Sequence, residues 1–416
     1  MSEATTQIRF WGVRGSTPTV DRATSRYGGN TACLELTTPR GTRIILDCGT
    51  GLRSLGTHLE GEGVAAPHDS ANGGNGNAAA KAAKSAHKDD SPAAVNAHIF
   101  ITHYHWDHIQ GIPFFAPLYS PQNQFQFYSF RSKFLGPDSL KQVFETQMAS
   151  PYFPVNVSAM SARRDFTEIS GGETLQIDDV RIRTFWLNHP QGCLGFRFET
   201  PAGIIAYATD NEPGDAGLDG NLLKLADHAD IFINDAQYTP EQLAGPRRGW
   251  GHSSWLAGAQ TAKEARARNL VLFHHDPDSS DRDVDALLRQ ARQHFDNVWG
   301  AAEGMAMSLG HDQMAVHIPT SGSTQRRDGN LRAHVSGFTS EGRAFAEETV
   351  IRDLTLQGAM LYLNHSPRLQ SELQVEMGDP GKEAPTEHPL RLRGYVVKLE
   401  PGPQTDQTAV GVVFTE

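Results

Sequence analysis

Short apolar runs, each ended by a polar turn, recur along the chain and predict a sheet with largely buried strands. Residues 97–102 show the pattern most clearly, because Ile99, Phe100 and Ile101 stand there in a row. The same pattern predicts strands at residues 7–13, 32–36, 43–47, 181–188, 203–209, 229–234 and 269–273. Ala-rich composition or helical spacing predicts helices at residues 140–148, 253–268 and 281–295. We expect Asp281 to cap the last of these helices rather than to bind a metal.

Several of the predicted strands end at an aspartate or a histidine. The residues that follow a strand in this way are Asp47, His189, Asp210, Asp235, His274 and His275. A rigid sheet that presents ligands on the loops at its edge is what a catalytic metal site requires. The adjacent residues His274 and His275 compete for one ligand position. Asp47 is a candidate partner for a ligand histidine, or else it caps the following turn at residues 52–59.

The highest density of metal-capable side chains lies directly after residues 97–102. The sequence His-Tyr-His-Trp-Asp-His places His103, His105, Asp107 and His108 within six residues. His103 and His105 alternate, so both imidazoles can face one ion from an extended backbone, and the two later residues can reach a second ion. The chain holds 18 histidines, so an isolated one means little, but this clustering without a metal would crowd polar groups for no gain. The stretch therefore predicts a metal site.

Length and composition add further constraints. A chain of 416 residues exceeds what one hydrophobic core usually supports, so we expect two domains. The formal net charge of −11 disfavours a polyanion-binding surface but leaves room for a small phosphorylated substrate. Cys33, Cys48 and Cys193 are odd in number and form no CxxC pair, which argues against a disulfide framework. With no apolar signal core and no transmembrane-length stretch, we expect a cytoplasmic protein without a membrane partner.

Two segments differ in composition from their surroundings. Residues 61–94 are rich in Gly, Asn, Ala, Lys and Ser without apolar periodicity, which predicts a disordered low-complexity insertion in which His68 and His87 are solvated. Residues 317–329 are polar and predict a linker. We therefore expect a first domain at residues 1–316 and a second domain at residues 330–416.

Taken in order, the strand that ends at Asp47, the HxHxDH stretch and the later residues His189, Asp210 and His274 resemble the metallo-β-lactamase fold. The resemblance covers roughly residues 7–316 and implies an α/β (α+β) domain, a four-layer αββα sandwich. It implies that a first metal is bound by His103, His105 and His189, and a second by Asp107, His108 and His274, with Asp210 bridging the two. His274 is preferred to His275 because it directly follows its strand, as in the family motif.

Within that fold the sequence is similar to the RNase Z-like phosphodiesterases. The likeness rests on Gly251-His252-Ser253-Ser254, the Ala-rich helix and the strand that leads to residue 274. It implies that His252 contacts the scissile phosphate; the alternative for His252 is an N-terminal cap on that helix. The tRNA-processing members carry a long arm between the third histidine and the bridging aspartate. Here His189 and Asp210 are only 21 positions apart, so tRNA is not the expected substrate.

The implied ligand set favours hydrolysis with two divalent ions, Zn²⁺ in the first place and Mn²⁺ or Fe²⁺ as alternatives. A hydroxide held between the ions would attack phosphorus in line while His252 stabilises or protonates the departing oxygen. Asp107 is a second candidate for handling a proton. The expected enzyme is a phosphodiesterase for a small substrate such as a cyclic phosphodiester. An ester or lactone hydrolase is an alternative, because the same metal pair activates water against carbonyl groups.

Alternating apolar segments after residue 330 predict a small β-barrel. The region resembles a PilZ domain in residues 353–358, Asp-Leu-Thr-Leu-Gln-Gly, and in the valine-rich strand at residues 410–414. PilZ domains that bind cyclic di-GMP also use an RxxxR arginine pair before the barrel. No such pair stands between residues 325 and 343, which argues against cyclic di-GMP as a ligand. A cyclic di-GMP-responsive signalling protein whose metal domain is no phosphodiesterase is the second hypothesis, and the sequence leaves a homodimer open.

Overall fold

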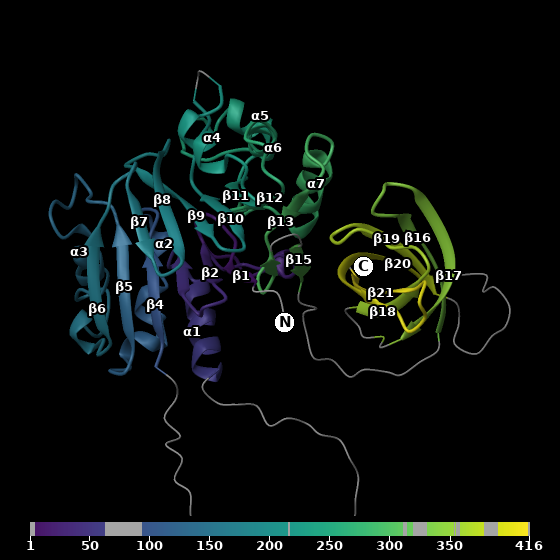
Figure 1. Cartoon of the computed structure of the whole chain (residues 1–416), viewed down its shortest axis with the longest axis horizontal. Helices are drawn as coiled ribbons and strands as arrows, with labels where there is room; N and C mark the ends of the chain where they lie inside the picture. The colour runs from purple at the N-terminus through teal and green to yellow at the C-terminus, as the bar shows by residue number, and fades with distance from the viewer. Residues whose placement is uncertain are drawn as a thin grey trace, which may run out of the picture.

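The structure is a computed structural model, and its described residues are 5–62, 94–214, 217–310, 314–318, 331–352, 354, 358–377 and 390–414. Within these ranges the chain forms a sandwich of two β-sheets with helices on both outer faces, followed by a closed β-barrel (Figure 1). The predicted αββα sandwich and the predicted small barrel are both confirmed. In this part of the chain, no helix has the length and apolar character needed to cross a bilayer.

One sheet of the sandwich combines strands from both ends of the first domain. Its strands are β1 (Thr6–Gly12), β2 (Cys33–Thr37), β3 (Arg43–Leu46), β4 (Asn96–Phe100), β5 (Gln124–Ser129), β6 (Arg163–Glu168), β14 (Ala306–Leu309) and β15 (Met314–His317). They lie in the order β15-β14-β1-β2-β3-β4-β5-β6. β3 to β6 run parallel to one another, and the other neighbours are antiparallel.

The second sheet supplies the opposite inner layer. Its strands are β7 (Thr174–Ile177), β8 (Val180–Leu187), β9 (Cys193–Thr200), β10 (Gly203–Ala208), β11 (Ile231–Asp235), β12 (Leu270–Phe273) and β13 (Val298–Gly300). They lie in the order β13-β12-β11-β10-β9-β8-β7, with β10 to β13 parallel. Most residues of β10, β11 and β12 are buried, as expected for parallel strands covered on both faces, and their apolar runs predicted them correctly.

Helices cover both outer faces of the sandwich. α1 (Gly51–Glu62) and α3 (Ser139–Gln147) pack on the first sheet, and α4 (Gly220–Ala226), α6 (Trp255–Glu264) and α7 (Asp281–Ala291) pack on the second. The side chains of Ser254 and Ser280 cap α6 and α7. The expected cap Asp281 is therefore wrong by one residue. Its carboxylate instead accepts the backbone N–H groups of Arg26 and Tyr27.

Short helical turns occupy the connections between the longer elements. They are α2 (Trp106–Ile109), α5 (Pro240–Ala244), η1 (Arg22–Thr24), η2 (Ile112–Phe114), η3 (Ala116–Tyr119) and η4 (Val157–Ala159). α2 follows β4 directly and carries the second half of the HxHxDH stretch.

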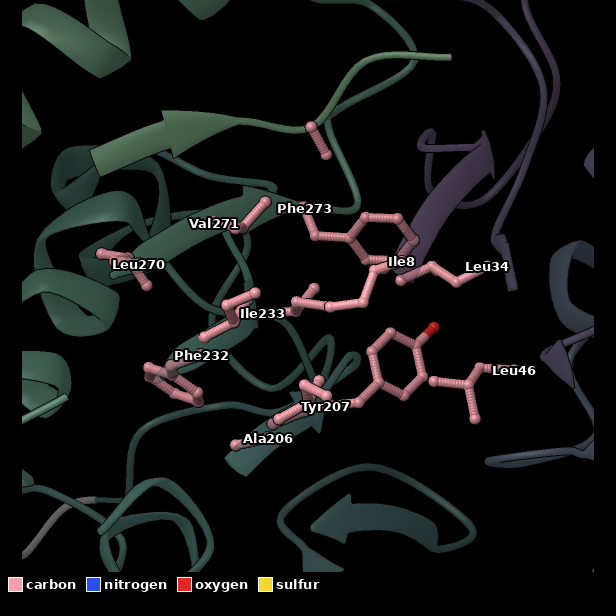
Figure 2. Close-up of a cluster of buried hydrophobic side chains, with 14 of the residues drawn as sticks. Ile8, Leu34, Leu46, Ala206, Tyr207, Phe232, Ile233, Leu270, Val271 and Phe273 are labelled. Carbon is pink, nitrogen blue, oxygen red and sulfur yellow. The ribbon is translucent and has the colours of Figure 1, made fainter. Parts of the chain in front are cut away.

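Apolar side chains fill the space between the two sheets. Figure 2 shows side chains of the first sheet meeting side chains of the second in one cluster, with Ile8, Leu34, Leu46, Ala206, Tyr207, Phe232, Ile233, Leu270, Val271 and Phe273 labelled. Another buried cluster lies beneath α1 and α3 on the outer face of the first sheet. Burial of both faces removes the central strands from water and holds their ends rigidly in place.

The pairing register brings the ends of parallel strands side by side. Leu46, the last residue of β3, pairs with the last residue of β4. In the other sheet Ala208 pairs with Asn234, and the last residue of β11 pairs with the last residue of β12. The loops that follow these strands are therefore brought together, and they carry the predicted ligands.

The barrel is formed by β16 (Leu331–Phe338), β17 (Ala344–Arg352), β18 (Gly358–Leu363), β19 (Glu372–Met377), β20 (Leu390–Pro401) and β21 (Thr408–Phe414). It closes in the order β16-β17-β18-β21-β20-β19 by pairing of β16 with β19. Its core consists of buried side chains such as Val335, Leu361, Val375, Val396 and Val412. Most of the PilZ-like motif at residues 353–358 lies outside the described residues, so the PilZ identity of the barrel stays a prediction.

The predicted segment boundaries shift slightly. Residues 61 and 62 belong to α1, and the rest of the expected insertion up to residue 93, with His68 and His87, lies outside the described residues. β15 continues through His317, one residue past the expected end of the first domain. Residues 319–329 of the expected linker lie outside the described residues. The aromatic residues Phe125 and Phe127 of β5 are core residues.

Candidate metal centre

The first ligand cluster consists of His103, His105 and His189, which each offer a ring nitrogen within 4.8 Å of the others. His103 and His105 come from the loop after β4, and His189 follows β8. The His189 Nε2 atom lies 3.1 Å from the His105 Nδ1 atom. On its other side, the His189 Nδ1 atom is 2.8 Å from the carbonyl oxygen of Gly251, which fixes the ring.

The second cluster consists of Asp107, His108, Asp210 and His274, all of them buried. The His274 Nε2 atom lies 3.1 Å from Asp107 Oδ2 and 3.2 Å from His108 Nε2. His108 Nε2 in turn lies 3.3 Å from Asp107 Oδ2. Two imidazole nitrogens and two carboxylates thus converge on one point, a donor set typical of Zn²⁺, Mn²⁺ or Fe²⁺ sites.

Asp210 faces both clusters with different oxygen atoms. Its Oδ1 lies 3.7 Å from His103 Nε2 and 3.9 Å from His189 Nε2. Its Oδ2 lies 3.1 Å from His108 Nε2 and 3.3 Å from His274 Nε2. One carboxylate therefore stands between the two sets of imidazoles, in the position that a bridging ligand would occupy.

The electrostatics of the second cluster favour a cation. Burial alone would raise the pKa of Asp107 and Asp210, but the charges of His108 and His274 hold both pKa values well below the usual range. Burial lowers the pKa of His108, yet three surrounding carboxylates, Asp210 first, overcome burial and raise that pKa well above its ordinary value. Ionised carboxylates that share one buried space require positive charge, which a divalent metal would supply.

In the first cluster, His103 and His189 favour the neutral imidazole form. Burial lowers the pKa of His103 well below its ordinary value and also lowers the pKa of His189. The Nδ1 atom of His103 contacts the hydroxyl of Thr102, while its buried Nε2 atom has no hydrogen-bond partner among the described residues. A buried and unpaired ring nitrogen that points at two other imidazoles fits a metal ligand well.

Three positions at the site have left-handed backbones although none of them is glycine. Asp47, Asp210 and His274 have φ values of 59°, 48° and 58°. Asp47 and His274 come directly after β3 and β12, and Asp210 is the second residue after β10. A left-handed turn aims the side chain back over the strand end, at a conformational cost that surrounding structure must offset.

Asp47 supports the ligands from behind. Its Oδ1 accepts hydrogen bonds from the backbone N–H and hydroxyl of Thr102, and its Oδ2 accepts one from the Tyr207 hydroxyl at 2.8 Å. The same Oδ2 lies 3.0 Å from His108 Nδ1. Of the two interpretations of Asp47 from the sequence, the structure shows the contact with a histidine that is a predicted ligand.

His274 is oriented in a similar way, and His275 is not part of the site. The His274 Nδ1 atom is 3.0 Å from Gln237 Oε1, whose amide nitrogen donates to the Ser16 hydroxyl. The Ser16 backbone N–H donates to Asp107 Oδ2 at 2.7 Å. His275 turns away and bonds the carbonyl oxygen of Ala301 at 2.9 Å. Of the two adjacent histidines, His274 therefore faces the candidate ligands and His275 does not.

His252 lies beside the second cluster and is held by Asp235. The two side chains are 2.9 Å apart through His252 Nδ1, which is also 3.6 Å from Asp210 Oδ1. Burial lowers the pKa of His252, but the charge and hydrogen bond of Asp235 outweigh burial and raise the pKa to about 9. Because Ser254 caps α6, the alternative role of His252 as a helix cap is wrong.

Two glycines allow the clusters to pack this closely. A Cβ atom at Gly251, where φ is 90°, would stand 2.3 Å from His189 Nδ1. A Cβ atom at Gly15 would stand 2.4 Å from His274 Nδ1. Any side chain at either position would push a candidate ligand out of place.

A pocket of about 260 Å³ opens beside the first cluster. Its lining combines His103, His105, Gln191 and Ser132 with the apolar residues Tyr104, Phe130, Phe134, Leu135 and Gly192. Gln191 Oε1 lies 3.2 Å from His105 Nε2, so the pocket and the cluster are continuous. A small ligand could therefore place a polar group at the imidazoles and an apolar group among the rings.

The structure brings together every residue predicted for the site. Several residues that hydrogen-bond to these predicted residues were not predicted from the sequence. Asp235 carried a signal, because it ends a predicted strand in the same way as the ligands do. Gln237, Ser16 and Tyr207 carried none, since one polar residue in a turn or strand is ordinary in any sequence.

Comparison with known proteins shows which family carries this site. Residues 42–275, more than half of the chain, match the family model described as "Beta-lactamase superfamily domain". The chain belongs to this superfamily. Its matched segment contains every predicted ligand, from His103 to His274.

The sequence of this beta-lactamase superfamily member is similar to those of known ribonucleases. It is 25% identical to Ribonuclease BN of Proteus mirabilis (strain HI4320) over 254 residues, which are 49% of this chain and 79% of that protein. It is 28% identical to Ribonuclease Z of Streptococcus sanguinis (strain SK36) over 251 residues, 48% of this chain and 78% of that protein. The predicted likeness to the RNase Z group and the prediction of a hydrolase are confirmed.

A solved structure shows the same fold. The metallo-beta-lactamase fold protein YhfI from Bacillus subtilis aligns with 74% of this chain and 100% of its own chain, at 15% identity and a TM-score of 0.50. This chain is therefore a hydrolase of the metallo-β-lactamase fold, with a metal-binding cluster of histidines and aspartates.

Proposed function

We propose that this hydrolase is a dinuclear metal-dependent phosphodiesterase that acts on a small phosphodiester. The observation that carries the proposal is Asp210, whose two oxygens face two separate sets of imidazoles. A phosphodiester carries a negative charge that increases around phosphorus during attack, and two adjacent cations are suited to neutralise that charge.

His103, His105 and His189 would hold one ion, and Asp107, His108 and His274 would hold the other, with Asp210 shared between them. Two divalent ions at these positions would lower the pKa of a water molecule toward neutrality and polarise the phosphoryl oxygens. Zn²⁺ is our first choice because imidazole and carboxylate suit it, and Mn²⁺ and Fe²⁺ suit the same donors.

His252 would protonate the departing oxygen. Asp235 occupies its Nδ1 atom, so the Nε2 atom is available to donate a proton or hydrogen bond at the substrate. His252 Nδ1 lies 3.6 Å from Asp210 Oδ1, so the imidazole would act beside the candidate metal ligands without being one of them. Asp107, which accepts the Ser16 backbone N–H, would serve mainly as a ligand and could pass on a proton.

Three features support a small substrate. The pocket at the first cluster holds about 260 Å³, too little for a folded RNA. The 20 residues between His189 and Asp210 are used mainly by β9 and β10, two paired antiparallel strands, which leave no long arm. The net charge of −11 also opposes a large polyanion.

The test is a substrate screen with the metal-loaded protein. Bis-p-nitrophenyl phosphate and cyclic nucleotides should be hydrolysed, and a precursor tRNA should remain intact. His105→Ala should abolish hydrolysis, whereas His228→Ala, a change at a surface histidine, should not. Cleavage of the tRNA without hydrolysis of small diesters would refute the substrate assignment. Failure to hydrolyse any diester, with His105→Ala indistinguishable from wild type, would refute the enzyme.

We propose that residues 330–416 form a PilZ-like regulatory or interaction domain attached to a hydrolase domain at residues 1–316. The closed barrel and its valine-rich final strand support this assignment. Without an RxxxR pair, cyclic di-GMP should release little heat in calorimetry, and tight binding would contradict that expectation.

A further inference from the structure

The pocket beside the first ligand cluster has a wall of aromatic side chains that are fixed in place. The Tyr104 hydroxyl donates to the carbonyl oxygen of Phe130, and the centres of the two rings are 5.1 Å apart. The Phe130 ring also packs edge-to-face with the Trp186 ring, at 5.3 Å between centres. Rings that are held in this way form a rigid apolar surface, which suits a planar group that lies against it.

Phe134 adds an exposed ring to the same pocket. It lies in the connection between β5 and α3, lines the pocket and is 64% exposed. A ring stacked against Phe134 would remove apolar surface of both partners from water, which favours binding. The pocket volume of about 260 Å³ exceeds the roughly 150 Å³ of an apolar cavity that binds benzene, so one substituted ring fits.

Gln191 lies where the pocket meets the candidate ligands. It follows His189 by two positions and has a φ value of 70°, a left-handed conformation that is uncommon outside glycine. With this backbone, the side-chain Oε1 atom lies 3.2 Å from His105 Nε2. A left-handed backbone at a residue with a side chain is costly and concentrates at functional sites, which makes Gln191 a candidate for contact with a ligand.

The contacts of His105 give the Gln191 amide a direction. His105 Nδ1 lies 3.1 Å from His189 Nε2, so Nδ1 is the atom that faces the other imidazoles. A nitrogen that binds an ion carries no hydrogen, so His105 Nε2 would carry it and donate to Gln191 Oε1. The Gln191 NH₂ group keeps two hydrogens, and no described residue accepts them. They are available to a ligand in the pocket.

The position of this NH₂ group decides which part of a substrate it can meet. The His105 imidazole lies between the ion position at Nδ1 and the amide at Nε2. The amide is therefore turned toward a group in the pocket rather than toward a phosphoryl oxygen at the ions. His252, which would protonate the departing oxygen, is not among the described residues that line the pocket. The pocket thus suits the ester group that stays on phosphorus.

We propose that this pocket is a subsite for the aromatic ring of the retained ester group, with the Gln191 amide donating to a polar acceptor on that ring. The subsite rests on the proposed function, because its ligand is the substrate of the same metal centre. The substrate class becomes a phosphodiester whose retained group is an aryl or heteroaromatic ring with an acceptor. Phe134 and Gln191 determine specificity, and neither takes part in the attack on phosphorus.

The test compares three phosphodiesters that all release p-nitrophenolate and retain a methyl, a phenyl or a p-nitrophenyl group. Each ester is compared between variant and wild type, so its intrinsic reactivity cancels. Phe134→Ala should lower kcat/KM about tenfold for the two aryl esters, because a ring contact is lost, and leave the methyl ester unchanged. The matched control is Tyr152→Ala, which removes a side chain that is 85% exposed and outside the lining, and it should leave all three unchanged.

Gln191→Glu isolates the donor from the contact with His105. The glutamate still accepts from His105 Nε2, so metal content should equal that of wild type, but it has no hydrogen to donate. Its charge repels all three esters alike. Because the nitro group also loses its donor, kcat/KM should fall about three- to tenfold further for the p-nitrophenyl ester than for the phenyl ester. Equal losses for these two esters would remove Gln191 from recognition.

Calorimetry with p-nitrophenyl phosphate and methyl phosphate measures the subsite without turnover of a diester. Wild type should bind p-nitrophenyl phosphate about tenfold more tightly, and Phe134→Ala should remove most of this difference. If no diester is hydrolysed, the proposed function fails, and the calorimetric difference alone decides the subsite. Equal losses for all three esters in Phe134→Ala, or equal binding of the two monoesters by wild type, would overturn the subsite.

Discussion

Replacing Asp47 by asparagine would test whether this buried carboxylate keeps His108 in the form that binds metal. The carboxylate is fully buried, and its Oδ1 accepts both hydrogen bonds from Thr102. Its Oδ2 accepts from the Tyr207 hydroxyl at 2.8 Å and lies 3.0 Å from His108 Nδ1. In the variant, Oδ1 can be retained, but an NH₂ group that only donates takes the place of Oδ2.

The consequence follows from the two partners of Oδ2. The Tyr207 hydroxyl can rotate and accept, but the imidazole of His108 can accept only if its proton moves from Nδ1 to Nε2. The Nε2 atom, 3.1 Å from Asp210 Oδ2, would then carry hydrogen and could not bind an ion. Loss of such a supporting contact typically weakens metal binding 10–100-fold, about 1.4–2.8 kcal/mol.

The assay is a titration of the metal-free protein with Zn²⁺ against a coloured chelator, which resolves two binding steps. One step should weaken by the stated factor, and the step assigned to His103, His105 and His189 should be unchanged. Asp230→Asn is the control, because Asp230 also accepts a backbone N–H, from Ile204, but lies at the start of β11. Two unchanged steps would refute the tautomer argument, and equal weakening of both would show that Asp47 acts through the fold.

Four further predictions concern other parts of the molecule. His252→Ala should slow diester hydrolysis about 10²–10⁴-fold at unchanged metal content, as measured by steady-state kinetics and metal analysis. Folding raises the pKa of His252 from 6.5 to about 9. In the metal-free protein, the stabilisation by the Asp235 contact is therefore complete below pH 6.5 and is lost as the pH rises through about 9. In Asp235→Asn, the free energy of urea unfolding should not show this decrease with pH. Gly251→Ala should displace His189 and lower metal content. Gln370→Ala should lose about 1–3 kcal/mol of unfolding free energy, because the buried backbone N–H and carbonyl oxygen of Gly300 lose their partner.

The changes at Gly251 and Gln370 have matched controls. Gly214→Ala adds a Cβ atom with no neighbour within 4 Å, and Gln142→Ala removes an exposed amide, so neither should alter metal content or stability appreciably. Full activity of His252→Ala would remove this residue from the mechanism. Normal metal content in Gly251→Ala would show that the loop can shift, and unchanged stability of Gln370→Ala would show that the barrel is held by other contacts.

Local patterns in the sequence predicted much of the sandwich. The runs that became β4, β10, β11 and β12 are short, apolar and followed by polar residues, and burial on both faces requires that composition. β9 was not predicted, because Cys193–Thr200 mixes Gly195, Arg197 and Glu199 with its apolar residues. The buried Arg197 guanidinium pairs with Glu199 on the same strand, and it also donates to the carbonyl oxygens of Leu225 and Asp227. Those carbonyl groups lie about 30 residues further along the chain.

The metal site shows the same division between local and distant information. The HxHxDH stretch is a local pattern, and it identified a ligand-rich loop without any knowledge of the fold. The choice of His274 over His275 depends on which ring meets Gln237 and Asp107 and which meets Ala301. The role of Asp235 depends on His252, 17 positions later in the sequence.

The sequence by itself therefore determined the type of chemistry, because metal ligands and buried strands are recognisable from the order of residue types. Only the tertiary structure decided that Asp210 faces both clusters and that Asp47 supports His108. These relations join residues far apart in the chain, and their distances are set by sheet register and domain packing. No short stretch of sequence encodes them, since each requires both partners to be folded in place.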